Sequence, residues 1–94
     1  MDDKRINLKV AGKSDPSLVA GSIAKNLDEG SEVHLTAIGA GAVNQMLKAV
    51  TIARSMCAST GKDLWFTSGF STEVIDGSEK TALKIFVKSL LYGL

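Results

Sequence analysis

The first third of the chain changes from a strand pattern to a helix pattern. Residues 6–10 alternate apolar and polar side chains, which predicts a half-buried strand. Asp15 is suited to be a helix N-cap, and Pro16 suits the first helical position, where no N–H is needed. Gly30 is placed to end this helix. Its predicted buried stripe consists of Ala20, Ile23, Ala24 and Leu27.

The middle of the chain predicts a second strand followed by a longer helix. Residues 33–38 are apolar enough for a central strand. They run directly into the small residues 39–42, after which the apolar positions recur at helical spacing until Gly61. The predicted apolar side of this helix consists of Val43, Met46, Leu47, Val50, Ala53 and Cys57.

The last third predicts two strands joined by a tight turn. Residues 64–75 are rich in aromatic, Thr and Val residues, with Gly69 marking the place where this strand would bend. Asp76-Gly77 is a strong hairpin signal. The segment after it fits both a strand and a helix, but a hairpin needs a second arm, which favours a strand to about Lys88. The order βαβαββ predicts a two-layer α/β sandwich.

Length and composition limit what this fold can do. The 94 residues predict one domain, 1–94, and the net charge of +1 means that any nucleic-acid contact depends on local clustering of cations. Cys57, the only cysteine, excludes an intramolecular disulfide and a multi-cysteine zinc site. We expect no signal peptide, no membrane span, no cofactor and no metal, and therefore a cytoplasmic location.

Three stretches of the chain carry the pattern of a known family. They are residues 8–16 with 19–21, residues 37–45 with 48–50 and 52–54, and residues 75–77 with 81–84. In these stretches the chain resembles the stage V sporulation protein S (SpoVS) family. The resemblance covers roughly residues 8–88; we place the domain core at about 6–88 and leave 89–94 as an unmatched tail.

The resemblance implies an Alba-like fold, with two helices on one face of a four-stranded mixed sheet, and commonly a homodimer or higher oligomer. It also implies a regulatory, non-enzymatic role in sporulation, exerted through DNA or RNA. Alba proteins bind through a basic loop and a long basic hairpin. Here the loop after the first strand keeps Lys13, whereas the hairpin at 76–80 is short and carries two acids. The second hypothesis is a protein-interaction module in sporulation signalling that does not bind nucleic acid.

Two rows of polar side chains are candidates for nucleic-acid contact. Asn44, Lys48, Thr51 and Ser55 share one helix face, which suits phosphates and sugars but also describes a solvated face. Lysines 80, 84 and 88 alternate with Ala82 and Phe86, which suits a single strand but also describes an edge strand protected by lysines. The predicted contact residues are Lys13, Asn44, Gln45, Lys48, Arg54, Lys80, Lys84 and Lys88.

The remaining candidates have weaker support. Gly39-Ala40-Gly41 joins a strand to a helix, where N–H groups can hold a phosphate, although close packing explains the same residues. His34 and Cys57 are interpreted as a satisfied strand histidine and a packing residue, so no catalytic residue is predicted. Trp65 and Phe66 are neighbours on a strand, so one of them faces away from the helices and marks an interface.

Overall fold

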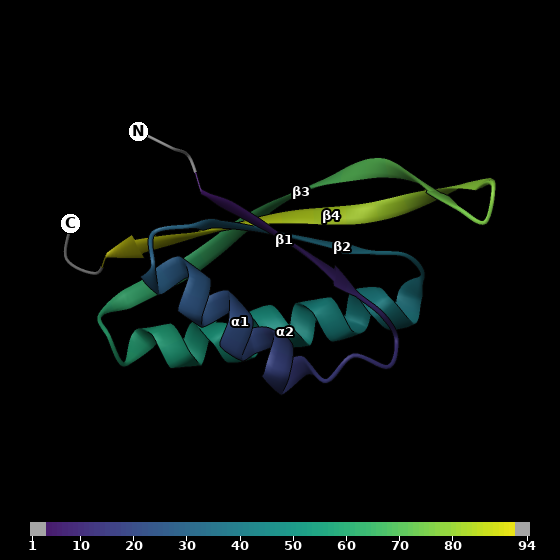
Figure 1. Cartoon of the computed structure of the whole chain (residues 1–94). Helices are drawn as coiled ribbons and strands as arrows, with labels where there is room; N and C mark the ends of the chain where they lie inside the picture. The colour runs from purple at the N-terminus through teal and green to yellow at the C-terminus, as the bar shows by residue number, and fades with distance from the viewer. Residues whose placement is uncertain (1–3, 92–94) are drawn as a thin grey trace.

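The chain folds into two layers, a pair of helices packed against one side of a sheet (Figure 1). The computed structural model describes residues 4–91. It confirms the predicted order βαβαββ. The elements are β1 (Arg5–Val10), α1 (Pro16–Asp28), β2 (Glu32–Ala37), α2 (Ala40–Ala58), β3 (Lys62–Ile75) and β4 (Ser78–Leu91).

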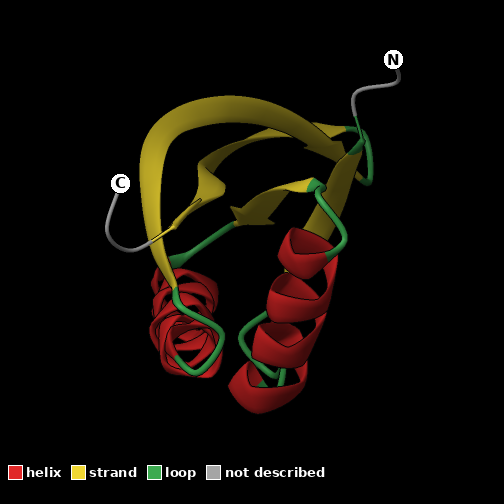
Figure 2. Cartoon of the chain, turned by 90° about the vertical axis from the view of Figure 1, so that its left-hand side faces the viewer, coloured by secondary structure: helices red, strands yellow, loops and turns green. Residues whose placement is uncertain are grey.

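The sheet is mixed, and its order in space is β1-β2-β4-β3. Strands β1 and β2 are parallel, since α1 carries the chain back between them, and β4 is antiparallel to both β2 and β3. Both edges of the sheet are therefore formed by strands far apart in sequence, β1 and β3. Figure 2 shows both helices on the same side of the curved sheet.

Helix α1 begins and ends at the predicted signals. The Asp15 side chain accepts a hydrogen bond from the Ser17 N–H at 2.9 Å, and Pro16 is the first helical residue. After Glu29, Gly30 takes a φ of +85°, in the left-handed region that favours glycine. Local sequence chemistry thus fixes both ends of this helix.

The core lies between the helices and the sheet. Its largest fully buried side chains are Ile23, Leu35, Met46, Ile85, Val33 and Val87. One residue that was predicted to be on the buried side of α2 is not in this core, because Leu47 is 40% exposed. Ala42 and Ala49 are buried instead, because small side chains let α2 approach its neighbours closely and so set which side of the helix faces inward.

Strands β3 and β4 form a long hairpin around a two-residue turn. Asp76 and Gly77 have φ values of 52° and 78°, as a type I′ turn requires. The ladder runs without interruption from Lys62 opposite Leu91 to Ile75 opposite Ser78, and Gly69 is paired with Lys84 within it, so there is no bulge at this position. The bend predicted at Gly69 stays a prediction. The turn is as short as predicted, but the hairpin is not short. Its tip extends past the rest of the sheet, because only residues 83–87 of β4 pair with β2 (Figure 1).

The strand interpretation of the final segment is correct and the helix alternative is wrong. Strand β4 continues to Leu91, beyond the predicted limit at Lys88, because β3 starts early enough to pair with it. The first part of the unmatched tail is therefore strand. Residues 92–94, like residues 1–3, lie outside the described part of the chain.

The position of the core gives a direct test of the fold. Leu35→Ala, which removes a fully buried side chain from β2, should lower the free energy of unfolding by about 2–5 kcal/mol. Leu18→Ala makes the same chemical change at a residue that is 75% exposed, and should shift it by less than about 0.5 kcal/mol. Urea denaturation measures both, and equal losses would contradict the core placement.

Candidate nucleic-acid interface

The predicted contact residues lie on two surfaces with the sheet between them. Asn44 and Lys48 are exposed on α2, in the helix layer. The predicted lysines of β4 point the other way, because they alternate with Ile85 and Val87, which are buried against the helices. The structure therefore does not bring all predicted residues together on one surface of the protomer.

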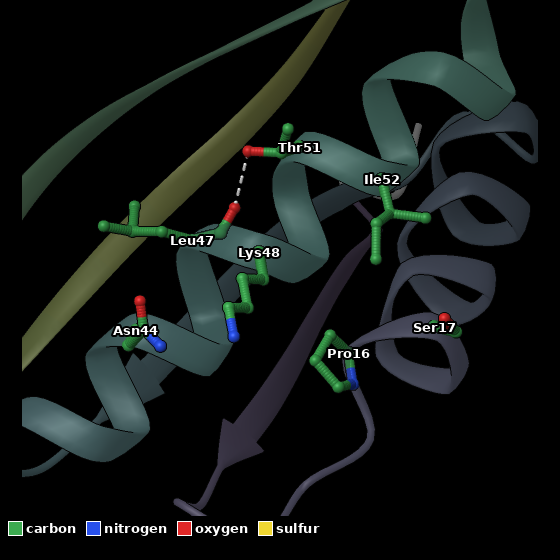
Figure 3. A pocket seen from close by; sticks show the side chains of 7 residues that line it. All are labelled: Pro16, Ser17, Asn44, Leu47, Lys48, Thr51 and Ile52. Carbon is green, nitrogen blue, oxygen red and sulfur yellow. Dashed lines mark hydrogen bonds between the residues drawn. The ribbon is translucent and has the colours of Figure 1, made fainter.

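The helix-side surface is a groove of about 380 Å³ between the start of α1 and α2 (Figure 3). Asn44 and Lys48 extend from successive turns of α2, and Lys48 lies across from Pro16. The Thr51 hydroxyl donates to the Leu47 carbonyl at 2.8 Å, within the helix. Much of the remaining lining is apolar, and Lys48 is its single cation. A groove of this composition offers little attraction for a phosphate backbone.

Gln45 fastens the loop that carries Lys13. Its amide Nε2 donates to the Ser14 carbonyl at 3.0 Å, while the Ser14 hydroxyl accepts from the Ala11 N–H at 2.9 Å. Lys13 is exposed on this loop. The Gln45 side chain thus has a structural contact of its own, and its predicted contact with nucleic acid stays a prediction.

Backbone conformation explains one of the two glycines at the start of α2. Gly39 is the N-cap, with φ 88° and ψ 157°, a conformation that essentially only glycine adopts. Gly41 lies against the loop, since a Cβ placed there would be 4.0 Å from the Gly12 Cα, an ordinary contact distance. Close packing therefore requires neither glycine, since a Cβ at Gly39 would meet nothing within 4 Å and one at Gly41 would make an ordinary contact. Phosphate binding at residues 39–41 stays a prediction.

Arg54 binds Asp63 through two hydrogen bonds. Its Nε donates to Oδ1 at 2.6 Å and its Nη2 to Oδ2 at 3.2 Å. Hydrogen bonds from Arg54, and secondarily from the Leu64 N–H, lower the pKa of the Asp63 carboxyl. The pair ties the end of α2 to the start of β3. A phosphate contact by Arg54 would have to compete with this carboxylate.

The second surface, which we call the outer sheet face, consists of the side chains of residues 4–91 that point away from the helices. The register places Arg5 and Lys9 of β1 on the same side as the β4 lysines. Its cations are Arg5, Lys9, Lys80, Lys84 and Lys88, and its acids are Glu32, Glu73 and Asp63, the last of which is bound by Arg54. The far part of the long β3–β4 hairpin curves over part of this face (Figure 2), where Glu73, Val74 and Ile75 line a pocket with Lys9 and Thr36.

Aromatic rings lie among these cations. The Lys84 Nζ is 5.9 Å from the centre of the Phe86 ring, and the Lys88 Nζ is 5.8 Å from that of Trp65. Both distances are within the range of a cation–π contact. Trp65 is 46% exposed. It is the member of the Trp65–Phe66 pair that faces away from the helices, so the sequence-based prediction of an exposed aromatic on this side is confirmed.

A comparison with protein families agrees with the pattern of motifs. A family model described as stage V sporulation protein S (SpoVS) matches residues 6–90, from the start of β1 almost to the end of β4. The chain belongs to the SpoVS family. This membership connects the chain with sporulation. Neither helix of this SpoVS chain, within residues 4–91, is long and apolar enough to cross a membrane.

Sequence reasoning found only part of the outer sheet face of the SpoVS chain. It identified the β4 lysines and Phe86 from their alternation, but it did not connect them with Arg5 and Lys9. Alternation in residues 5–10 already indicated that these two cations share a side. What was missing was the strand order, which brings β1 within one strand of β4.

His34 and Cys57 lie on opposite sides of the sheet. Cys57 is buried in the core, and desolvation raises the pKa of its thiol. His34 is buried on the outer side, with its ring edge against Phe86 at 4.6 Å between ring centres. Its Nε2 donates to Glu32 Oε1 at 2.7 Å and thereby lowers the pKa of Glu32. Within residues 4–91 the Nδ1 atom has no hydrogen-bond partner, so the interpretation of His34 as a satisfied strand histidine holds for Nε2 alone.

The Gly39 conformation leads to a prediction with a control on the same turn. Gly39→Ala should lower the free energy of unfolding by about 1–3 kcal/mol, because Ala is strained at this φ and ψ. Gly41→Ala should leave it unchanged or raise it by up to about 1 kcal/mol, because the position is helical and has room for a methyl group. Thermal or urea denaturation compares them, and an unaffected Gly39→Ala variant would contradict the assignment.

The Arg54–Asp63 pair predicts a pH dependence of stability. The pKa of Asp63 is lower in the folded chain than in the unfolded chain, so the ionised carboxyl favours folding. This contribution is complete at neutral pH and is lost as the pH falls from about 4 through the lowered pKa. Denaturation midpoints of the wild type and Asp63→Asn should therefore differ at pH 7 and converge towards about pH 2. A difference that does not change with pH would contradict the pair.

Proposed function

We propose that this SpoVS protein is a non-enzymatic regulator that binds nucleic acid as a homodimer. The observation that carries the proposal is the arrangement of the outer sheet face. There Lys84 and Lys88 lie over aromatic rings, on the same side of the sheet as Arg5 and Lys9. The whole chain has a net charge of only +1, so this gathering of cations is local. Local clusters of this kind attract phosphate backbones without a high overall charge.

The geometry of the sheet supports multiple phosphate contacts. Neighbouring strands are about 4.8 Å apart, so cations on β1 and β4 flank a band roughly 10 Å wide across β2. Asn7 and Thr36 add polar groups within it. With only a few cations in each protomer, we expect micromolar affinity, which a dimer strengthens by presenting two such faces.

The homodimer part of the proposal is supported by an apolar row on the other side of β3. Phe66, Phe70 and Val74 share the side that faces the helix layer, yet the Phe70 and Val74 residues are 82% and 70% exposed, since α2 packs mainly against the first part of the strand. A second copy of this chain would cover the row. A specific dimer should bury about 1,200 Å² or more in total.

The same apolar row favours a second candidate function. A surface that exposes two or three large apolar side chains on a projecting hairpin also suits another protein. In that case the SpoVS chain acts in sporulation as a protein-interaction module, and the cations of the outer sheet face only keep the sheet soluble.

Binding measurements at two salt concentrations separate these functions. Fluorescence anisotropy with labelled oligonucleotides should show an affinity that falls by about 0.7–0.9 log units per log unit of salt for each phosphate neutralised. Lys84→Ala combined with Lys88→Ala should weaken binding and flatten the salt slope by about two. Lys25→Ala combined with Lys48→Ala removes the same charge from the helix layer and should have little effect. No binding to any nucleic acid at low salt would leave the interaction module as the function.

Light scattering tests the dimer. The wild type should have twice the chain mass of 9.9 kDa at micromolar concentration. Phe70→Ser combined with Val74→Ser should shift it towards the monomer, because polar side chains remove the apolar contact. Leu18→Ser is the matched control on α1 and should leave the mass unchanged. A wild-type mass near 9.9 kDa would reject the homodimer.

A further inference from the structure

We infer that the outer sheet face is a stacking platform for single-stranded nucleic acid, with a base stacked on Trp65 and the backbone held by the surrounding cations. This inference rests on the proposed nucleic-acid function and names its substrate class. It follows from how the rows of side chains cross the sheet.

The first row crosses all four strands and ends at Trp65. The register places Arg5 beside Glu32 and Lys88 beside Trp65. Glu32 and Lys88 line the same pocket, which joins the two pairs into one row. Trp65 is 46% exposed, and the Lys88 Nζ over its ring belongs to an exposed, flexible side chain that an incoming base can displace. Trp65 also borders Arg54 and Thr51 in a groove at the β3 edge. The row thus has an accessible indole ring at one end, and its cations lie within reach of a nucleic-acid backbone that crosses the sheet.

The second and third rows leave space beside a second ring. Phe86 lies between His34 and Thr67, and the next row contains Lys9, Thr36, Lys84 and Gly69. Gly69 has no side chain, and a Cβ there would be 3.8 Å from the Phe86 Cε2. Any larger side chain at this position would extend over the Phe86 ring. Trp65 and Phe86 are diagonal neighbours on β3 and β4, within roughly 7–8 Å, so successive bases can reach both.

The chemistry of this face favours a single strand over a duplex. A single strand exposes base faces that stack on aromatic rings, whereas a duplex keeps its bases stacked inside and offers mainly phosphates. A duplex would also be bound best by a projecting basic arm. The projecting hairpin tip instead carries the acids Asp76 and Glu79, which repel phosphates. A protein partner fits less well, because the centres of protein interfaces are depleted in lysine.

The only tryptophan of the chain makes the experiment direct, because its intrinsic fluorescence reports on Trp65 alone. Oligo(dT) and oligo(rU) should quench this fluorescence and bind at least about tenfold more tightly than a blunt duplex of the same length. With a labelled oligo(dT), Trp65→Leu should weaken binding by about 5- to 150-fold, the loss expected on removing one stacking ring. Trp65→Phe, which keeps a ring, should retain most of the affinity. Thermal melting verifies that both variants are folded.

The outcomes separate this inference from the function on which it rests. Tighter binding of the duplex, or equal affinity of Trp65→Leu and the wild type for oligo(dT), would overturn the stacking platform. The proposed function would survive either result, provided that binding still falls with salt and with loss of Lys84 and Lys88. Failure of every nucleic acid to bind at low salt would overturn both.

Discussion

Packing both helices against one side of a sheet divides the residues of every strand into two environments. Along β4, Ile85 and Val87 pack against the helices, while Lys84, Phe86 and Lys88 point to the side away from the helices. The uninterrupted ladder with β3 carries this division to the edge, where it places Trp65 next to Lys88. A register slip by one residue would exchange the core and the outer sheet face. The fold and the proposed interface therefore depend on the same pairing.

This division also explains why the predicted contact residues do not form one surface. Arg54 and Lys48 belong to the helix layer, where Asp63 binds the first and an apolar groove surrounds the second. The lysines of β4 belong to the opposite side, which they share with Arg5 and Lys9. Across that side the cations have aromatic rings as neighbours. This combination, which the helix layer does not offer, supports nucleic-acid binding by this SpoVS protein at the sheet.

Local signals made much of the fold predictable from the sequence. Asp15 and Gly30 mark the two ends of the first helix, and Asp76-Gly77 specifies the turn. Each of these signals acts locally, through a side-chain cap at Asp15 and through a positive φ at the other three residues. The exposure of Leu47 was not predictable from helical spacing, since it depends on how closely α2 approaches its neighbours. The gathering of Arg5 and Lys9 with the β4 lysines was not predictable either, because pairing of β2 with β4 is a long-range choice. Family resemblance supplied the fold, but not this surface.

Nuclear magnetic resonance with the ¹⁵N-labelled chain tests the central claim, that nucleic acid binds across the outer sheet face. During titration with unlabelled oligo(dT), the largest shift changes should appear at the Trp65 indole N–H and at backbone amides of β4 and β1. The amides of residues 44–52, beside the helix-layer groove, should change little. Changes confined to those residues and to the loop around Lys13 would contradict the account, because binding would then take place on the helix side of the sheet.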